Sequence, residues 1–325
     1  MSAKVHITII GLGRIGTALG RALKQAASDQ VYIVGHDKDP ERARVAVREK
    51  AIDRGEWNLP RSVEGADLVI LALPLSAIKE TLAYIAEDLR PNAVVTDTAP
   101  LMVPPLRWAQ DTLPQEVHFI PGHPIVRDVL PSSEVPSPDI FRDEFYCLGT
   151  TASAHPKAVK LLTDMLNLIG ARPFFLQPEE HDALMAGVEQ TPRVLALALL
   201  HAVTQSPGWR DMRKLAGVQF EAATYTTYAD AEGLVAELLS NREHVLSWLE
   251  SMEKHLAHWR GLLEAGDEER LHEHVRVLLD AREQWLKAAL AREWEEKGPQ
   301  EKGFSFRHWL FGETFSRRWR ERREK

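Results

Sequence analysis

Cysteine is almost absent from this chain of 325 residues, since Cys147 is the only one. A single thiol cannot form a disulfide within the chain, and no cluster of thiols offers a metal site, so we expect no disulfide framework and no bound metal. Cations are outnumbered as well, with 40 Lys and Arg against 47 Asp and Glu and a formal net charge of −7. This balance argues against a general nucleic-acid-binding protein.

Long apolar runs and a leader segment are also lacking. The N-terminus enters an apolar run at once, without a charged and then apolar leader, and no apolar run approaches the roughly 20 residues of a membrane span. We therefore expect a cytoplasmic chain with no membrane partner. Hydrophobic residues make up 44% of the sequence, enough for a substantial core, and the length favours two domains.

The most informative stretch lies at the start of the chain. An apolar, β-branched run over 4–10 breaks into Gly11-Leu-Gly-Arg-Ile-Gly16, and an Ala- and Leu-rich segment at helical spacing follows. In this setting of strand, tight turn and helix, three glycines at this spacing are typical of a dinucleotide site. Gly11 permits the turn, Gly13 lets the backbone approach the pyrophosphate, and Gly16 lets the helix pack on the strand. The helix N-terminus then offers free N–H groups to the phosphates.

An acidic residue follows the second predicted strand. The apolar run 31–34 leads to Asp37, at about the distance past Gly16 where a carboxylate meets the adenosine ribose. A carboxylate there accepts hydrogen bonds from the ribose hydroxyls and repels a 2′-phosphate. We therefore predict NAD as the cofactor and NADP as the less favoured one, with the neighbouring Lys38 partly offsetting that repulsion.

Strands and helices alternate over the first half of the chain. Apolar runs over 67–73, 93–97 and 117–120 are separated by helical patterns, which is typical of a doubly wound parallel sheet of the Rossmann type. Ligands of such sheets lie outside the carboxyl ends of the strands. The predicted cofactor-binding residues are Gly11, Gly13, Arg14, Ile15, Gly16, Asp37, Leu73 and Pro74.

From about residue 153 helical patterns follow one another with little strand signal. We predict a dinucleotide-binding domain over 1–152, an all-α substrate and dimerisation domain over 153–297, and a basic aromatic tail over 298–325. The tail could touch a membrane or nucleic acid, but the acidic balance of the chain favours docking on its own protein.

Two apolar seams run through the last predicted helices. The first seam comprises Val245, Leu249, Met252, Leu256, Trp259 and Leu263, and the second Leu271, Val275, Leu278 and Trp285. Gly266 and Asp267 form the predicted turn between them. The apolar side chains of the two seams would be buried either by a helical hairpin within one chain or by a homodimer formed through these helices.

One histidine stands apart from the other twelve. His123 lies in Pro121-Gly-His-Pro-Ile125, directly after a predicted strand at the carboxyl edge of the sheet. Hydride transfer to a nicotinamide needs a base for the substrate hydroxyl, and imidazole suits that role because its unperturbed pKa lies near working pH. A solvent-exposed loop histidine is the alternative.

These landmarks resemble the prephenate and arogenate dehydrogenases of tyrosine biosynthesis, over about residues 5–232. The glycine triplet, Asp37 and 67–74 resemble that family's NAD-binding segments, and Gly122-His-Pro124 is similar to the segment with its catalytic histidine. The matching second-domain landmarks are Pro178-Glu-Glu-His-Asp182, Gln190-Thr-Pro-Arg193 and Gly208-Trp-Arg-Asp-Met212 through Ala216. The resemblance implies oxidative decarboxylation with His123 as base, and an anionic substrate bound by Gln190, Arg193, Arg213 and Lys214.

The chain departs from the family pattern at three positions. Pro100 stands where the family has the serine that orients its histidine, and Thr96 and Thr98 are the nearest hydroxyls. Arg193 stands in place of a histidine, and Lys214 in place of the substrate arginine, whose bidentate geometry a lysine lacks. Two alternatives therefore remain open: a divergent NAD-dependent dehydrogenase of another hydroxy acid, and a catalytically silent NAD-binding relative.

Overall fold

The computed structural model describes residues 4–126, 136–151, 154–225, 231–292 and 294. By the density of its contacts the chain divides into two compact units, Met1–His258 and Trp259–Lys325. The first unit therefore holds the predicted dinucleotide-binding domain together with the first helices of the predicted helical domain.

A six-stranded sheet forms the centre of the first unit, in the order β3-β2-β1-β4-β5-β6. All five pairings are parallel. This is the Rossmann strand order: β2 and β3 are added on one side of β1, and β4, β5 and β6 on the other side. It confirms the predicted fold class. The strands are β1 (Val5–Ile10), β2 (Val31–His36), β3 (Arg54–Gly55), β4 (Leu68–Leu71), β5 (Val94–Asp97) and β6 (His118–Ile120).

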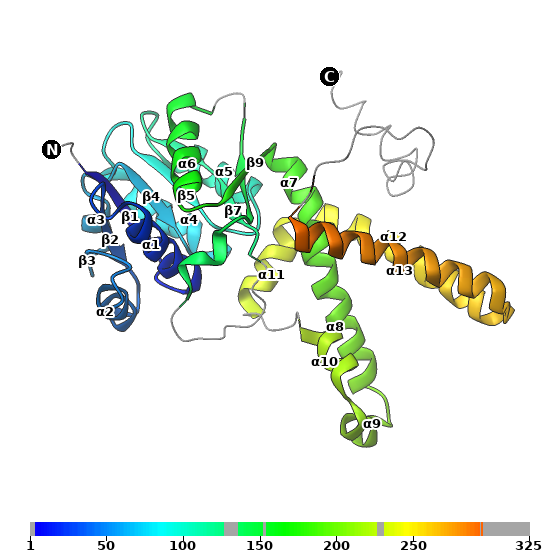
Figure 1. Ribbon diagram of the computed structural model, residues 1–325. Coiled ribbons are helices and arrows are strands. Elements are labelled where there is room, and N and C mark those ends of the chain that lie inside the picture. Colours follow the sequence, from blue (N-terminus) through cyan, green and yellow to red (C-terminus); the bar gives the residue numbers. More distant parts are fainter. Residues whose placement is uncertain (1–3, 127–135, 152–153, 226–230, 293, 295–325) are drawn as a thin grey trace, which may run out of the picture. The chain divides into compact units, whose positions relative to one another are not determined.

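Helices cover the sheet (Figure 1). Successive side chains of a strand point to opposite faces, so alternate residues of β4 enter two separate cores: Leu68 and Ile70 in one, Val69 and Leu71 in the other. All four are buried, as an uninterrupted apolar strand requires. The helices of this part are α1 (Arg14–Ala27), α2 (Pro40–Arg48), α3 (Leu59–Val63), α4 (Leu75–Ile85) and α5 (Val103–Thr112), with short 3₁₀ turns at Ala86–Asp88 and Pro138–Phe141.

A second, three-stranded sheet follows, in the order β7-β8-β9. Its strands are β7 (Gly122–Pro124), β8 (Phe145–Gly149) and β9 (Arg172–Leu176), with α6 (Pro156–Leu168) between the last two. β7 runs antiparallel to β8, so the segment with His123 is a strand and not the loop considered above. β9 lies beyond residue 152 and has no alternating pattern, which is why the sequence did not indicate it.

The rest of the described chain is helical, in agreement with the predicted all-α region. Its helices are α7 (Pro178–Met185), a π-helical turn (Ala186–Gln190), α8 (Thr191–Thr204), α9 (Trp209–Leu215), α10 (Val218–Thr224), α11 (Ala231–Ser240), α12 (Arg242–Ala265) and α13 (Glu268–Ala291). The predicted turn before α13 is confirmed: Gly266 has a φ of +62°, and the Asp267 side chain caps the helix by accepting from the backbone N–H of Arg270. The predicted tail lies outside the described residues.

One continuous helix is long and apolar. Pro178–Thr204 spans 27 residues with a mean hydropathy of 1.2 in its most apolar window, of which 22% is buried. By length and composition such a helix could cross a membrane, although core helices of soluble proteins meet the same criterion. The sequence predicted a helix here but no segment of membrane-spanning length, because charged residues such as Glu189 and Arg193 interrupt the apolar stretch without ending the helix.

Candidate active site

Two of the three glycines in the first turn are required by the packing of the protein itself. Gly11 has a φ of +93°, and a Cβ atom on it would collide with the carbonyl oxygen of Ala72. A Cβ atom on Gly16 would likewise collide with the carbonyl oxygen of Gly11. The side chain of the predicted cofactor residue Leu73 also lies against Gly11. The turn after β1 and the turn after β4 therefore touch at the carboxyl edge of the sheet, where Pro74 leads into α4.

Gly13 is different because the space around it is open. A Cβ atom there would meet only the tip of the flexible Arg42 side chain, at 3.8 Å, and its φ of −74° suits any residue. Gly13 is also the N-cap of α1, with no side chain bonded to the first helical N–H groups. Arg14 and Ile15 form the first turn of α1. An uncapped helix N-terminus beneath an open backbone fits a dinucleotide pyrophosphate.

Asp37 connects this turn to the end of β2. Its Oδ2 accepts a hydrogen bond from the backbone N–H of Leu12 at 2.7 Å, and its Oδ1 accepts from the N–H of Asp39 at 2.9 Å. Arg42 lies 3.8 Å away. Because each carboxylate oxygen accepts two hydrogen bonds, Asp37 retains capacity for ribose hydroxyls. The two hydrogen bonds fix the orientation of the Asp37 carboxylate, which fits the ribose hydroxyls of NAD.

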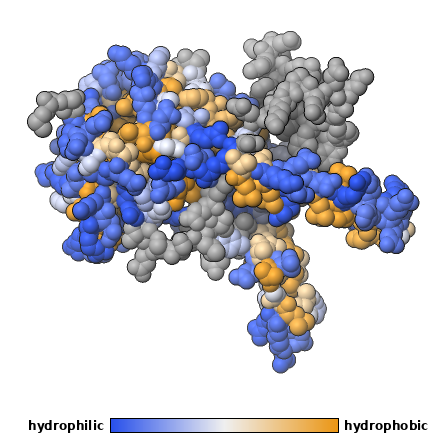
Figure 2. All heavy atoms as spheres, in the orientation of Figure 1, coloured by the Kyte–Doolittle hydropathy of each residue, from blue (hydrophilic) through white to orange (hydrophobic). Residues whose placement is uncertain are grey.

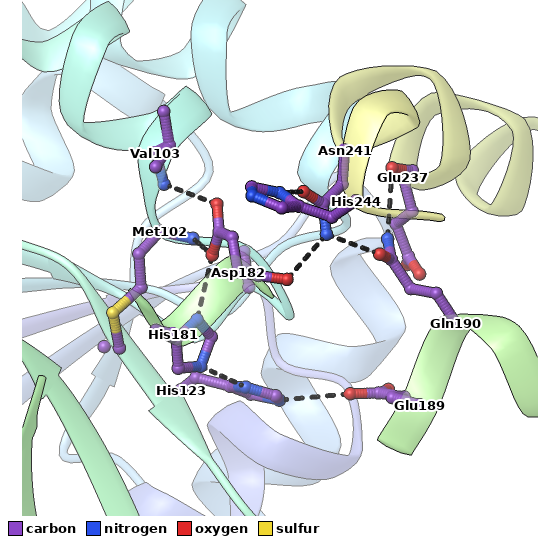
Figure 3. A network of polar contacts seen from close by, with 12 residues as sticks. Met102, Val103, His123, His181, Asp182, Glu189, Gln190, Glu237, Asn241 and His244 are labelled. Carbon is purple, nitrogen blue, oxygen red and sulfur yellow. Dashed lines mark hydrogen bonds and ion pairs between the residues drawn. The ribbon is translucent and has the colours of Figure 1, made fainter. Parts of the chain in front are cut away.

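A second cluster surrounds His123 (Figure 3). His123 Nδ1 lies 3.1 Å from His181 Nε2, and His181 Nδ1 lies 2.9 Å from Asp182 Oδ1. All three residues are buried. Burial is the main cause that lowers the pKa of His123 to about 3, and the positive charge of Arg193 acts in the same direction. His123 is therefore neutral at physiological pH, with a lone pair on one of its two ring nitrogens.

Asp182 joins this cluster to the edge of the sheet. Its Oδ1 accepts from the backbone N–H of Met102 at 2.8 Å, and its Oδ2 from that of Val103 at 2.9 Å. These N–H groups lie at the N-terminus of α5, which favours a negative charge. Pro178-Glu-Glu-His-Asp182 served above only as a helix landmark, so sequence reasoning missed both His181 and Asp182.

The loss of the family's serine is not made up by Thr96. Its hydroxyl is buried and has no hydrogen-bond partner. The segment from Thr98 to Met102 instead contributes one backbone donor to Asp182, the N–H of Met102.

Arg193 lies near His123 but is already paired. Its guanidinium donates to Glu189 Oε1 at 2.5 Å and to Glu237 Oε2 at 2.6 Å, and burial raises the pKa of both glutamates. Glu189 Oε2 lies 3.9 Å from His123 Nε2, too far for a hydrogen bond. Two carboxylates and one guanidinium leave this group without excess positive charge when both glutamates are ionised.

Gln190 is almost completely buried, and its amide is used within the protein. It donates to the carbonyl oxygen of Glu237 at 3.1 Å and accepts from Asn241 at 2.7 Å. Asn241 also donates to the backbone carbonyl of Asp182 at 2.8 Å. Gln190 thus fixes the end of α11 and Asn241 against the π-helical turn, and Asn241 bonds in turn to α7.

The structure does not bring Arg213 and Lys214 to this cluster within one chain. Both are exposed on α9, and Lys214 pairs with Asp211 at 2.8 Å. α9 follows α8, whose 14 residues extend ~21 Å from the Gln190 end. Among the described residues, no three His, Cys, Asp or Glu side chains are arranged to hold a metal ion.

Comparison with known proteins identifies the family. The nucleotide-binding domain of prephenate dehydrogenase matches residues 19–174, and its dimerization domain matches residues 177–277. This chain belongs to the prephenate dehydrogenase family. A cyclohexadienyl dehydrogenase of Zymomonas mobilis is 27% identical over 87% of this chain and 96% of its own length. A prephenate dehydrogenase of Lactococcus lactis is 29% identical over 77% of this chain and 69% of its own.

Solved structures of similar proteins share the fold. Prephenate dehydrogenase from Aquifex aeolicus, in complex with hydroxyphenyl propionate and NAD+, superposes with a TM-score of 0.78 at 24% identity, over 87% of this chain and 99% of that one. Synechocystis arogenate dehydrogenase gives 0.71 at 21% identity, over 86% of this chain and all of that one. The member described here is an NAD-dependent dehydrogenase, and the turn at residues 11–16 fits that cofactor.

A third feature of the site lies beneath His123. Asp97, at the end of β5, is fully buried and accepts from the backbone N–H groups of Gly122 at 3.1 Å and Ala99 at 3.2 Å. Burial raises its pKa to about 8. Asp97 thus fixes the residue before His123 and holds β7 against β5.

We expect Gly13→Ala to weaken NAD binding at least tenfold without reducing the thermal stability of the protein. The added methyl group meets no protein backbone but occupies the space that the pyrophosphate needs. Calorimetric titration with NAD and a thermal melt measure the two effects. Gly11→Ala is the contrasting variant and should lower the melting temperature. Equal NAD affinity in Gly13→Ala and the unaltered protein would remove Gly13 from the cofactor site.

Asp97 should make the protein less stable as the pH rises. Its pKa is about 8 in the folded protein and 3.8 as a model value, so between these values the folded state binds more protons and stability falls with increasing pH. Asp97→Asn removes this dependence, so its unfolding free energy should improve relative to the unaltered protein from about pH 5 to about pH 8. Urea unfolding measures this, with Asp111→Asn, on the exposed surface of α5, as the control. Parallel pH profiles would contradict the assignment.

Proposed function

We propose that this enzyme catalyses the NAD-dependent oxidative decarboxylation of prephenate, with His123 as the base. The observation that carries the proposal is the setting of His123: a buried, neutral imidazole whose Nδ1 is bound by His181, while no hydrogen bond ties its Nε2 to Glu189. The relatives named prephenate dehydrogenase and cyclohexadienyl dehydrogenase support the substrate class.

The reaction divides between cofactor and protein. NAD, when bound, accepts the hydride from the ring carbon that bears the hydroxyl. His123 Nε2 takes the proton of that hydroxyl. The bond to the ring carboxylate breaks, carbon dioxide leaves, and the electron pair of that bond completes the aromatic ring. The ring oxygen then takes the proton back, so His123 ends the cycle neutral.

Cations must also bind the substrate carboxylates, because a buried carboxylate without a partner is costly. The charge of Arg193 acts on His123, and we propose that substrate competes with Glu189 for the Arg193 guanidinium. Gln190 supports this position from the π-helical turn before α8. Arg213 and Lys214 would bind the substrate from the surface of α9, which requires a second copy of the chain to supply them.

Arogenate is the second candidate substrate. It carries an ammonium group where prephenate carries a keto group, and the carboxylates of Glu189 and Glu237 beside His123 would suit that cation better than a second anion. The remaining alternatives are oxidation of another hydroxy acid and a catalytically silent NAD-binding role. The departures from the family pattern at Pro100 and Lys214 favour these two alternatives.

His123→Asn should reduce turnover of prephenate roughly 10²- to 10⁴-fold, the usual contribution of a general base, while NAD still binds. Reduced nicotinamide is followed by absorbance with prephenate and, in parallel, arogenate. The control is His118→Asn, which alters a histidine of β6 that stacks on His155. A fully active His123→Asn variant would refute the proposed base. NAD binding without turnover of any hydroxy acid by the unaltered protein would favour the silent alternative.

We further propose that the enzyme is a homodimer formed through its C-terminal helices. Large apolar side chains are exposed on α8, α9 and α10, and hydrophobic surface gathers there (Figure 2). From the π-helical turn to α10 the most exposed are Val188, Leu215 and Val218. The family model that covers this region is described as a dimerization domain.

Sedimentation equilibrium tests the dimer. We expect a mass of twice the 36.7 kDa of one chain, because a second copy would remove these apolar side chains from water. A charged substitution, Val188→Glu, should shift the equilibrium toward the monomer. A monomer at all concentrations would contradict the proposal, and binding of the unaltered protein to lipid vesicles would indicate that the apolar helix serves a membrane instead.

A further inference from the structure

Three buried side chains form a continuous line from the start of α5 to His123. The backbone N–H groups of Met102 and Val103 bind the Asp182 carboxylate, which lies 2.9 Å from His181 Nδ1, and His181 Nε2 lies 3.1 Å from His123 Nδ1. The two imidazole planes are inclined at 82°, so one ring meets the other edge-on (Figure 3). His181 is fully buried.

The protons along this line are determined by the chemistry of its ends. An ionised carboxylate can only accept hydrogen bonds, and Asp182 already accepts two from the backbone, so the proton between it and His181 belongs to His181 Nδ1. In a neutral His181 the other nitrogen, Nε2, then has a lone pair and no proton. His123 Nδ1 must therefore carry the proton that forms the 3.1 Å contact. A neutral His123 with a proton on Nδ1 has its lone pair on Nε2.

We propose that His181 and Asp182 are positioning residues that hold His123 in the one tautomer able to accept a proton at Nε2. This inference rests on the proposed function of His123 and extends it to two buried residues that influence the reaction through His123. They act through the ring of His123: they fix its rotation about the Cβ–Cγ bond and keep its lone pair on the nitrogen that faces away from His181.

The same line also stabilises His123 after it has accepted a proton. The charged ring would donate from Nδ1 to His181 Nε2, whose own Nδ1 proton is bound to the negative charge of Asp182. Opposite charge at the end of a hydrogen-bonded line favours the protonated state without requiring a proton to leave His123. The negative charge of Asp182 thus acts against the burial that keeps His123 neutral.

The arrangement explains how the chain can dispense with the serine that Pro100 replaces. A hydroxyl that orients a histidine supplies one hydrogen bond, and in this chain His181 supplies it from α7. The backbone that follows Pro100 contributes in another way. The N–H of Met102, two residues further on, is one of the two donors to Asp182. The segment that lost a side-chain hydroxyl thus contributes through its backbone.

Asp182 is a poor position for a test, because its carboxylate also holds the backbone at Met102 and Val103. His181 is better. In His181→Phe the ring keeps its approximate size but has no nitrogen to accept from His123. In His181→Gln the side-chain oxygen can still accept that hydrogen bond. The matched control is His155→Phe, which removes a partly buried histidine outside the cluster.

The test reads the tautomer of His123 directly. Long-range proton–nitrogen correlation spectra of histidine-labelled protein, without substrate, distinguish the two nitrogens of each neutral ring, and His123→Asn identifies the signals of His123. We expect the Nδ1–H tautomer in the unaltered protein, in His181→Gln and in His155→Phe. In His181→Phe we expect a shift to the Nε2–H tautomer that free histidine prefers. An Nε2–H tautomer in the unaltered protein, or an unchanged one in His181→Phe, would overturn the proposal.

Kinetics give the second measurement. His181→Phe should lower kcat about 10- to 100-fold with little change in KM, and His181→Gln should recover most of that loss. In a His123→Asn background, His181→Phe should have no further effect on kcat. Equal losses in the Phe and Gln variants would indicate a structural role only. Because the spectra need no turnover, they remain decisive even if prephenate proves not to be the substrate.

Discussion

The carboxylate of Asp182 is the contact on which the geometry of the site depends. It is the point where the first helix after the sheets, α7, is bonded to the carboxyl edge of the main sheet, through two backbone N–H groups at the start of α5. Any movement of α7 relative to the sheet would break two charge-assisted hydrogen bonds in a buried setting, where an unpaired carboxylate is costly. The distance between the cofactor loop and the helical residues is fixed by this attachment more than by apolar packing, which tolerates small displacements.

A second buried carboxylate acts on the opposite side of His123. Asp97 binds the N–H of Gly122, so the strand that carries His123 is held from below by β5 and from the side by His181. Burial is the main reason for the raised pKa of Asp97, and the charge of Asp182 adds to it. The site thus combines one carboxylate that is stabilised by a helix N-terminus with one that burial drives toward its neutral form.

Most of the sheet could be predicted from the sequence, because β1, β2 and β4 are apolar runs that end in glycine, aspartate or proline at the carboxyl edge. Apolar runs and the turn residues that end them are local features of the sequence and need no long-range information. β7 and β9 could not be predicted in this way. Each is a short segment whose strand conformation depends on pairing with β8, and Pro124 and Pro173 argue locally against a strand.

The same distinction applies to the site. Gly11, Gly13, Gly16 and Asp37 form a local motif, and their placement around one turn followed from spacing alone. His181 could not be assigned a role from sequence reasoning, because its distance from His123 along the chain is 58 residues and its partner Asp182 is adjacent to it. Arg193 was expected to bind an anionic substrate, but in the structure its guanidinium pairs with Glu189 and Glu237. The pairing with Glu237 could not be predicted locally, because this residue lies on α11, 44 residues further along the chain.

The π-helical turn at Ala186–Gln190 has a consequence for how this region can change. Such a turn corresponds to one residue more than an α-helix would hold over the same length. Deleting a single residue there would restore regular α-helix and leave the side chains after it facing nearly the same way relative to α7, because the wider turn already accommodates the extra residue. Deleting a residue within α8 would instead rotate everything after it by about 100°. The π-helical turn is therefore a place where this helix can lose one residue and still present Arg193 to Glu237 on α11.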